Sequence, residues 1–336
     1  MTPAVGTRAT PWFARRSGAH VAHHRDDWGD ARWSFIYREG YAGEARERGE
    51  FGPLDGVGPG MLKPPVWTWE VPLYFWFGGI ASGSAFVALA CDLAGDHRSA
   101  RLARATALAA LVPCPPLLVL DLGRPERFLN MLRIVKTRSP MSMGAWALTL
   151  FGNLIGAAVG ADLLGRQKTA RSLGAATAVV GGYLGSYTGV LLAGTAVPVW
   201  ARSRSFLGPI FVCTATATGA AATRLVLSAA GVGPEHPSWT ALRRVQAGAI
   251  GAELALSTVN ERRLGRYAAP LHRSGKMKWA KRLVYAGLAL QAAGRPKPGH
   301  AASVAYLAAG LLFRYAWVQA GPESARDDRL VAEMSR

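Results

Sequence analysis

The sequence predicts an all-α integral membrane protein of about eight transmembrane helices, preceded by a polar N-terminal extension. Half of its 336 residues are hydrophobic and only 18% are charged, against about 25% in ordinary soluble domains. Apolar stretches recur along the chain, and a helix needs about 20 such residues to cross the hydrocarbon core of a bilayer. The stretches are continuous and rich in Ala, Leu and Gly, which favours helices over the alternating strands of a membrane β-barrel.

Residues 1–65 form the polar extension. Arg15 and Arg16 are followed by polar residues and not by an apolar segment, which argues against a secretory or twin-arginine signal. Aromatic residues between Trp28 and Tyr41 are interspersed with the charges, and there are more of them than a purely disordered segment needs. Two interpretations stay open: a flexible tail, or a segment that becomes ordered against a partner subunit.

Residues 66–321 hold the predicted spans. They are residues 71–91, 104–121, 141–161, 173–197, 206–229, 245–260, 282–294 and 301–320. The seventh is the shortest. Glycines four residues apart, such as Gly79 and Gly83, favour close packing between membrane helices. The prolines at positions 113, 115 and 116 predict a kink in the second span, because proline removes a hydrogen bond from the helix.

Positive charge is spread between the apolar segments. The formal net charge is +18, but Lys and Arg fill the loops and form no single patch, so anionic lipid headgroups are a better partner than nucleic acid. The loops on the N-terminal side carry more Lys and Arg than those on the other side, mainly through residues 261–282. The positive-inside rule then predicts a multi-pass protein of the cell membrane with both termini, including a polar tail at 322–336, in the cytoplasm.

Metal and haem ligands do not occur in the patterns that would bind these groups. Cys91, Cys114 and Cys213 are isolated, with no spacing that suits an iron–sulfur cluster or zinc. The histidines fall in the extension, in loops or at a helix end, so a haem b held by two axial histidines inside the bilayer has no ligands. The sequence therefore predicts no haem, no iron–sulfur cluster and no metal in this chain.

The first span begins with a carboxylate among aromatic residues. The tryptophans there are typical of interfacial anchoring. Glu70 precedes Tyr74 by four residues, so both side chains can face one pocket near the membrane surface. A quinone headgroup in such a pocket would need hydrogen-bond and proton partners of these types.

Three charged residues interrupt later spans: Arg224, Glu253 and Arg314. A lone ionised group in hydrocarbon costs several kcal/mol and must face protein or water. Two interpretations stay open for Arg224 and Glu253: they pair between adjacent helices, or they belong to a proton path. Arg314 can belong to the same series of polar residues. Asp121 and Arg124, at the end of the second span, are expected to cap and brace the following connector and to contribute to partner docking.

Four motifs resemble one family. They are Gly-Gly-Ile-Ala-Ser-Gly at 78–83, Asp-Leu-Gly-Arg-Pro at 121–125, Ser-Pro-Met-Ser-Met-Gly-Ala-Trp at 139–146 and Ser-Tyr-Thr-Gly-Val-Leu-Leu at 186–192. Together they resemble the polysulfide-reductase-type membrane subunits of the NrfD/PsrC family. The resemblance covers approximately residues 66–321.

This resemblance implies a haem-free, quinone-binding subunit whose eight helices form two four-helix bundles. Such a subunit docks to a ferredoxin-like iron–sulfur protein, which is joined to a molybdopterin catalytic subunit, and is not catalytic alone. In the family a tyrosine of the fourth helix and polar residues at the start of the first line the quinone site, which by position implies Tyr187, Tyr74 and Glu70. Some members carry Asn and His near the first-helix start, where this chain has Val71 and Tyr74.

The function expected from these observations is electron exchange between a membrane quinone, menaquinone by expectation, and an iron–sulfur partner subunit, in either direction. One alternative is a non-catalytic anchor or proton-conducting subunit without quinone binding, which Val71 favours. A second is a secondary transporter, for which the proline-rich second span is the one indication.

Overall fold

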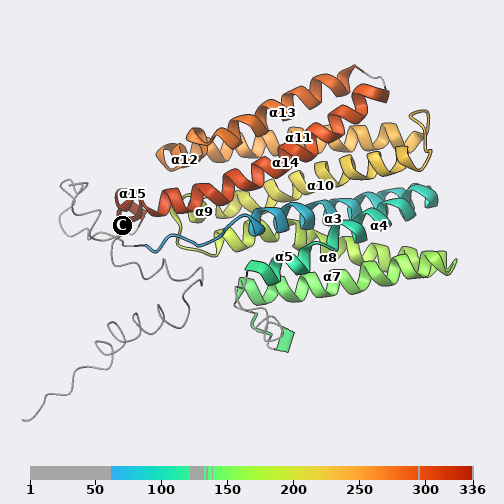
Figure 1. The fold of residues 1–336 in the computed structure, drawn as a ribbon, viewed down its shortest axis with the longest axis horizontal. Coiled ribbons are helices and arrows are strands. Elements are labelled where there is room, and N and C mark those ends of the chain that lie inside the picture. Colours follow the sequence, from blue (N-terminus) through green and yellow to red (C-terminus); the bar gives the residue numbers. More distant parts are fainter. Residues whose placement is uncertain (1–61, 122–131, 134, 138, 294–295, 335–336) are drawn as a thin grey trace, which may run out of the picture.

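The computed structural model describes residues 62–121, 132–133, 135–137, 139–293 and 296–334. These residues are helical apart from short connections, with no strand among them, and the long helices run side by side (Figure 1). The predicted all-α membrane fold is confirmed. The N-terminal extension up to residue 61 and Arg124 lie outside the described residues.

A first unit contains the first four predicted spans. Its helices are α3 (Glu70–Leu93), α4 (His97–Leu111), α5 (Cys114–Asp121), α7 (Pro140–Leu163) and α8 (Gln167–Ala193). α3 packs against α4 and α8, and α7 packs against α8 and α4. The second span is interrupted at Val112 and Pro113, between α4 and α5, where the prolines predict a kink.

A second unit repeats this arrangement. Its long helices are α10 (Arg204–Ala229), α11 (Pro237–Leu264), α13 (Gly275–Ala292) and α14 (Pro296–Ala325). α10 takes the place of α3: it packs against α11 and α14, as α3 packs against α4 and α8. α13 packs against α14, as α7 packs against α8. In contrast, the backbones of α11 and α13 make few contacts, and side chains join the two helices, Lys281 to Glu261 and Gln291 to the Arg243 carbonyl.

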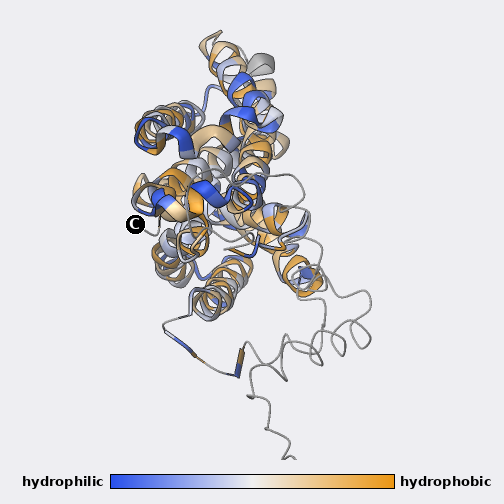
Figure 2. Ribbon diagram, turned by 90° about the vertical axis from the view of Figure 1, so that its left-hand side faces the viewer, coloured by the Kyte–Doolittle hydropathy of each residue, from blue (hydrophilic) through white to orange (hydrophobic). Residues whose placement is uncertain are grey.

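Four short helices complete the described chain: α9 (Pro198–Arg202) before α10, η3 (Gly265–Ala268) and α12 (Ala269–Arg273) between α11 and α13, and α15 (Asp328–Met334) after α14. They gather at the end of the molecule where α3 begins (Figure 1). Seen from that end, hydrophilic residues occupy the segments nearest the viewer, and the helices behind them are largely hydrophobic (Figure 2).

Six of the predicted spans are confirmed as helices long and apolar enough to cross a membrane: α3, α4 with α5, α7, α8, α10 and residues 299–325 of α14. The other two, in α11 and α13, are helical but more charged. In α13 the apolar part begins only after Lys281 and Arg282, and the ten residues that follow cover about 15 Å at 1.5 Å per residue. Half the thickness of a bilayer core is about this length, so a count of eight spans stays a prediction.

Glycines bring the two units into close contact. A Cβ at Gly83 of α3 would overlap the backbone of Ala215 in α10, and a Cβ at Gly219 of α10 would overlap Gly83. Gly189 of α8 lies equally close to the backbone of Gly208 in α10. Backbone approach of this kind needs residues without side chains, so the glycine spacing correctly predicts tightly packed helices.

Candidate functional site

A partly open pocket of about 460 Å³, including the solvent space at its mouth, lies in the first unit, where residues at the start of α3 contribute to its wall. Tyr74 of α3 and Tyr187 of α8 both line it. The other lining residues are Trp67, Val71, Phe75, Leu117, Leu118, Asp121, Met141, Ala145 and Leu191. The fold thus brings two of the predicted site residues from distant parts of the chain to one mostly apolar cavity.

Tyr187 is held by a glycine on the neighbouring helix. Its side chain is 4% exposed, and a Cβ at Gly144 of α7 would overlap the phenol ring. The ring of Tyr183, one turn earlier, lies with its centroid 6.1 Å from that of Tyr187. Gly144 therefore has a physical role in the Ser-Pro-Met-Ser-Met-Gly motif, because any side chain there would move the tyrosine.

Glu70 lies beside this cavity and does not line it. The side chain is buried at the first residue of α3, one turn before Tyr74, and the Thr68 hydroxyl donates a hydrogen bond to its carboxylate. The preceding carbonyl, of Trp69, accepts a hydrogen bond from Tyr315 of α14 at 3.0 Å. The start of α3 is thereby attached to the second unit.

Asp121 and Trp67 line the cavity, although other roles were expected for them. Asp121, expected to cap the connector, is the last residue of α5 and contributes to the cavity wall. Trp67, expected to anchor the interface, lines the cavity and stacks on Trp200 of α9 with ring centroids 5.0 Å apart. Each of these contacts joins segments that are distant in the chain, so the spacing of neighbouring residues in the sequence could not predict them.

The three charges predicted for a proton path have separate surroundings. Arg224 donates to Gln246 at 2.7 Å and lies over the Trp239 ring, 4.8 Å from its centroid. Arg314, 2% exposed, donates to Thr188 at 2.7 Å and to the Phe211 carbonyl at 3.4 Å.

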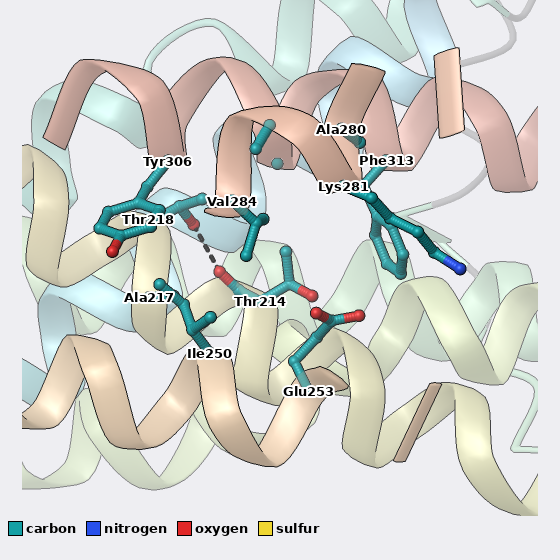
Figure 3. A pocket seen from close by; sticks show the side chains of 12 residues that line it. Thr214, Ala217, Thr218, Ile250, Glu253, Ala280, Lys281, Val284, Tyr306 and Phe313 are labelled. Atoms are coloured by element: carbon teal, nitrogen blue, oxygen red, sulfur yellow. Dashed lines mark hydrogen bonds between the residues drawn. The ribbon is translucent and has the colours of Figure 1, made fainter. Parts of the chain in front are cut away.

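Glu253 does not take Arg224 as a partner. It accepts a hydrogen bond from Ser257 at 2.6 Å and lines a second cavity, in the second unit (Figure 3). The pairing interpretation for Arg224 and Glu253 thus has no contact to support it among the described residues.

A buried ion cluster at the opposite end of the first unit was missed by sequence reasoning. Arg104 of α4, 1% exposed, donates to Asp162 of α7 at 2.6 and 2.9 Å and to Asp92 of α3 at 2.5 Å. His97 lies 3.4 Å from the other Asp92 oxygen. The sequence places all of these residues at helix ends, where charges are ordinary, so only the fold identifies the cluster.

Metal ligation has no candidate in the parts of the chain that the structure describes. No group of three or more His, Cys, Asp or Glu side chains converges there, and all three cysteines are free.

Six helices long and apolar enough to cross a membrane define a multi-pass helical membrane protein, and the partly open pocket of its first unit, lined mostly by apolar side chains and by two tyrosines, is its candidate ligand site. A sequence model for the family described as polysulphide reductase, NrfD, matches residues 58–259. The chain belongs to this family, as its motifs predicted. A comparison with curated proteins gives no match.

Family membership indicates a membrane subunit of a quinone-interacting oxidoreductase complex. Subunits of this family typically work with iron–sulfur and molybdoenzyme subunits. The match covers the whole of the first unit and ends within α11, so it includes the cavity of Tyr74 and Tyr187.

Proposed function

We propose that this chain is the quinone-reactive membrane subunit of its complex and that a quinone, menaquinone by our expectation, binds in the cavity of the first unit. The observation that carries the proposal is the convergence of Tyr74 and Tyr187 on one apolar-walled cavity. A phenol is a hydrogen-bond donor that suits a quinone carbonyl. The bound quinone would supply the electron and proton chemistry, and the protein would bind and orient it.

The residues of the cavity divide the task of binding. The hydroxyls of Tyr187 and Tyr74 would orient the headgroup, and Val71, Phe75 and Leu117 would exclude water from its faces. Asp121, in the wall, and Glu70, one turn from Tyr74, would exchange protons with water at the membrane surface. Val71 has no polar side-chain group, so of the two first-helix positions where some members carry Asn and His, only Tyr74 would donate a hydrogen bond in this chain.

The proposed electron partner is a ferredoxin-like iron–sulfur subunit that docks where α3 begins and α5 ends, with a molybdopterin subunit bound beyond it. Asp121 supports this placement because it lines the cavity and ends the second span at the same face. Arg124, three residues later, would contribute to the same docking surface.

Proton movement through the second unit is a further part of the proposal, with Glu253, Arg224 and Arg314 as its stations. Each of the three side chains is buried. Each forms hydrogen bonds with uncharged groups, so its own charge would remain able to interact with water. Because their side chains do not contact one another directly, such a path needs water between them.

The test is equilibrium binding of a fluorescent menaquinol analogue to the purified complex. Tyr187→Phe removes one hydroxyl and keeps the ring, and loss of one hydrogen bond of about 0.5–1.5 kcal/mol predicts affinity roughly 3–10-fold weaker. Tyr285→Phe is the matched control, because Tyr285 of α13 is exposed. Saturable binding that weakens only in Tyr187→Phe supports the proposal. An intact complex that binds no analogue refutes it and favours a non-catalytic anchor.

A further inference from the structure

The second unit reproduces the arrangement of the quinone cavity in different residues. It holds a partly open pocket of about 480 Å³, including the solvent space at its mouth, and the correspondence covers the second, third and fourth helices of each unit. The second helix of each unit supplies a carboxylate, Asp121 of α5 and Glu253 of α11, and the fourth supplies a tyrosine, Tyr187 of α8 and Tyr306 of α14.

The third helix of each unit extends the correspondence. A Cβ at Gly287 of α13 would overlap the ring of Tyr306, as a Cβ at Gly144 of α7 would overlap the ring of Tyr187. Each tyrosine therefore rests on a glycine of the preceding long helix. Both units thus combine four helices with a carboxylate, a tyrosine and a glycine that contacts the tyrosine. Corresponding residues of the two units lie at different positions along their helices.

The cavity has polar groups at its two ends. Tyr306 is 2% exposed, and its hydroxyl has no hydrogen-bond partner among the described residues. A buried hydroxyl without a partner is destabilising, so a ligand that accepts its hydrogen bond would be favoured. At the other end lies the Glu253 carboxyl, with Val284 and Ile250 between them (Figure 3).

The charges favour a neutral ligand over a phospholipid. Lys281 is the cation of this cavity, but both oxygens of Glu261 hold its ammonium group, at 2.8 and 2.9 Å. Arg224, which interacts electrostatically with Tyr306, is held by the Gln246 side chain at 2.7 Å, and a phosphate headgroup in the cavity would face the Glu253 carboxyl. A quinone carries no charge, accepts hydrogen bonds at two opposite carbonyls, and has an apolar tail that suits the space between α11 and α13, where the backbones make few contacts.

We propose that the cavity of the second unit binds a second isoprenoid quinone, with one carbonyl hydrogen-bonded to Tyr306 and the other directed towards Glu253. Its tail leaves between α11 and α13, between the Lys281–Glu261 ion pair and the Gln291–Arg243 hydrogen bond that join these helices. This site is separate from the cavity of the first unit and uses none of its residues.

The experiment counts quinone equivalents by titrating the purified, delipidated complex with a short-chain menaquinone. The unaltered protein should bind two equivalents. Tyr306→Phe should weaken one of them about tenfold and leave the other unchanged, whereas Tyr187→Phe should weaken the other. Val284→Phe fills the second cavity and should remove its equivalent altogether. Tyr285→Phe, next to Val284 and exposed, is the control, and thermal unfolding verifies that every variant is folded.

Each outcome decides the proposal. Two equivalents that respond separately to the Tyr187 and Tyr306 changes support it. A single equivalent that responds only to Tyr187→Phe overturns the second site and leaves the proposed function standing, and no binding at all overturns both. If Val284→Phe, analysed before delipidation, lacks a phospholipid that co-purifies with the unaltered complex but keeps both quinone equivalents, the cavity is a lipid site and the proposal is wrong.

Discussion

At the scale of single residues, the position of Tyr187 depends on the absence of a side chain opposite it. Gly144→Ala would place a methyl group inside the phenol ring, so the ring must move or α7 and α8 must separate. Overpacking of this kind costs about 1–3 kcal/mol. We expect Gly144→Ala to bind the menaquinol analogue at least as poorly as Tyr187→Phe, with a lower melting temperature.

Gly156→Ala is the matched control for this prediction. Gly156 lies on the same helix, and a Cβ there would meet nothing within 4 Å. Alanine is the better helix former by about 1 kcal/mol, so this variant should be neutral or slightly stabilised. Unchanged quinone affinity in Gly144→Ala would show that the glycine does not position Tyr187.

Asp96 is a second residue with a defined task, and it lies outside the membrane-spanning helices. Burial opposes ionisation of its carboxyl, but hydrogen bonds from the Ser238 hydroxyl and from the Ser99 backbone N–H, with His236 nearby, leave its pKa below the usual value of 3.8. Because the folded state binds this proton less tightly, the ionised carboxyl stabilises the protein above about pH 4. That contribution is lost as the pH falls towards the lowered pKa.

Asp96→Asn tests this contribution. The variant should melt at a lower temperature than the unaltered protein near pH 7, and the difference should shrink below about pH 4, where the native carboxyl also becomes neutral. Melting curves between pH 3 and 7 in one detergent provide the measurement. A difference that does not change with pH would mean that the charge of Asp96 contributes nothing.

The residues of the candidate site were only partly predictable. Tyr74 and Tyr187 could be identified because they occupy recognisable motifs. Tyr306 and Gly287 could not, because their significance comes from a contact between two helices, which hydropathy does not specify. The hydrogen-bond partners of Arg224 and Glu253 were likewise unpredictable, because the side chain of either residue could have contacted several neighbouring helices.

At the scale of helices, the Arg104 cluster joins three elements of the first unit. Its guanidinium contacts Asp162 and Asp92 and is almost fully buried. Removing one member of a buried ion pair leaves the other charge uncompensated, at a cost of about 3–5 kcal/mol. We expect Arg104→Gln to lower the free energy of unfolding by roughly this amount.

Arg101→Gln, at an exposed position of the same helix, should be close to neutral in the same denaturation experiment. A neutral replacement of the whole cluster, Arg104→Met with Asp92→Asn and Asp162→Asn, should recover part of the loss, because no charge then remains buried without a partner. Equal stability of Arg104→Gln and the unaltered protein would refute the role of the cluster.

Helix positions were more predictable than helix partners. Long apolar runs located six spans, and the prolines located the break between α4 and α5. In α11 and α13 the charges that interrupt the apolar runs serve other contacts, such as the ion pair of Lys281 with Glu261. Composition alone therefore could not decide whether these two helices cross the membrane.

At the scale of the whole molecule, two similarly packed units share one interface, formed by α10 against α3 and α8. Arg314 lies there, between Thr188 of α8 and the Phe211 carbonyl of α10. The two cavities are thus parts of one rigid helical body, and a partner docked at the start of α3 would contact the unit that holds the first cavity.

The final prediction concerns the orientation of this body in the membrane. Lys and Arg are most concentrated in the segment from α11 to α13, at the end where α3 begins, and the positive-inside rule places that end in the cytoplasm. In a protein whose native cysteines are replaced by serine or alanine, we introduce Arg273→Cys at this end or Glu235→Cys between α10 and α11. Both positions are exposed. A membrane-impermeant maleimide added to intact cells should label Glu235→Cys and spare Arg273→Cys until the cells are opened. The reverse pattern would put the proposed docking face, and with it the iron–sulfur partner, on the outer side of the membrane, and the quinone of the first unit would then exchange its protons there.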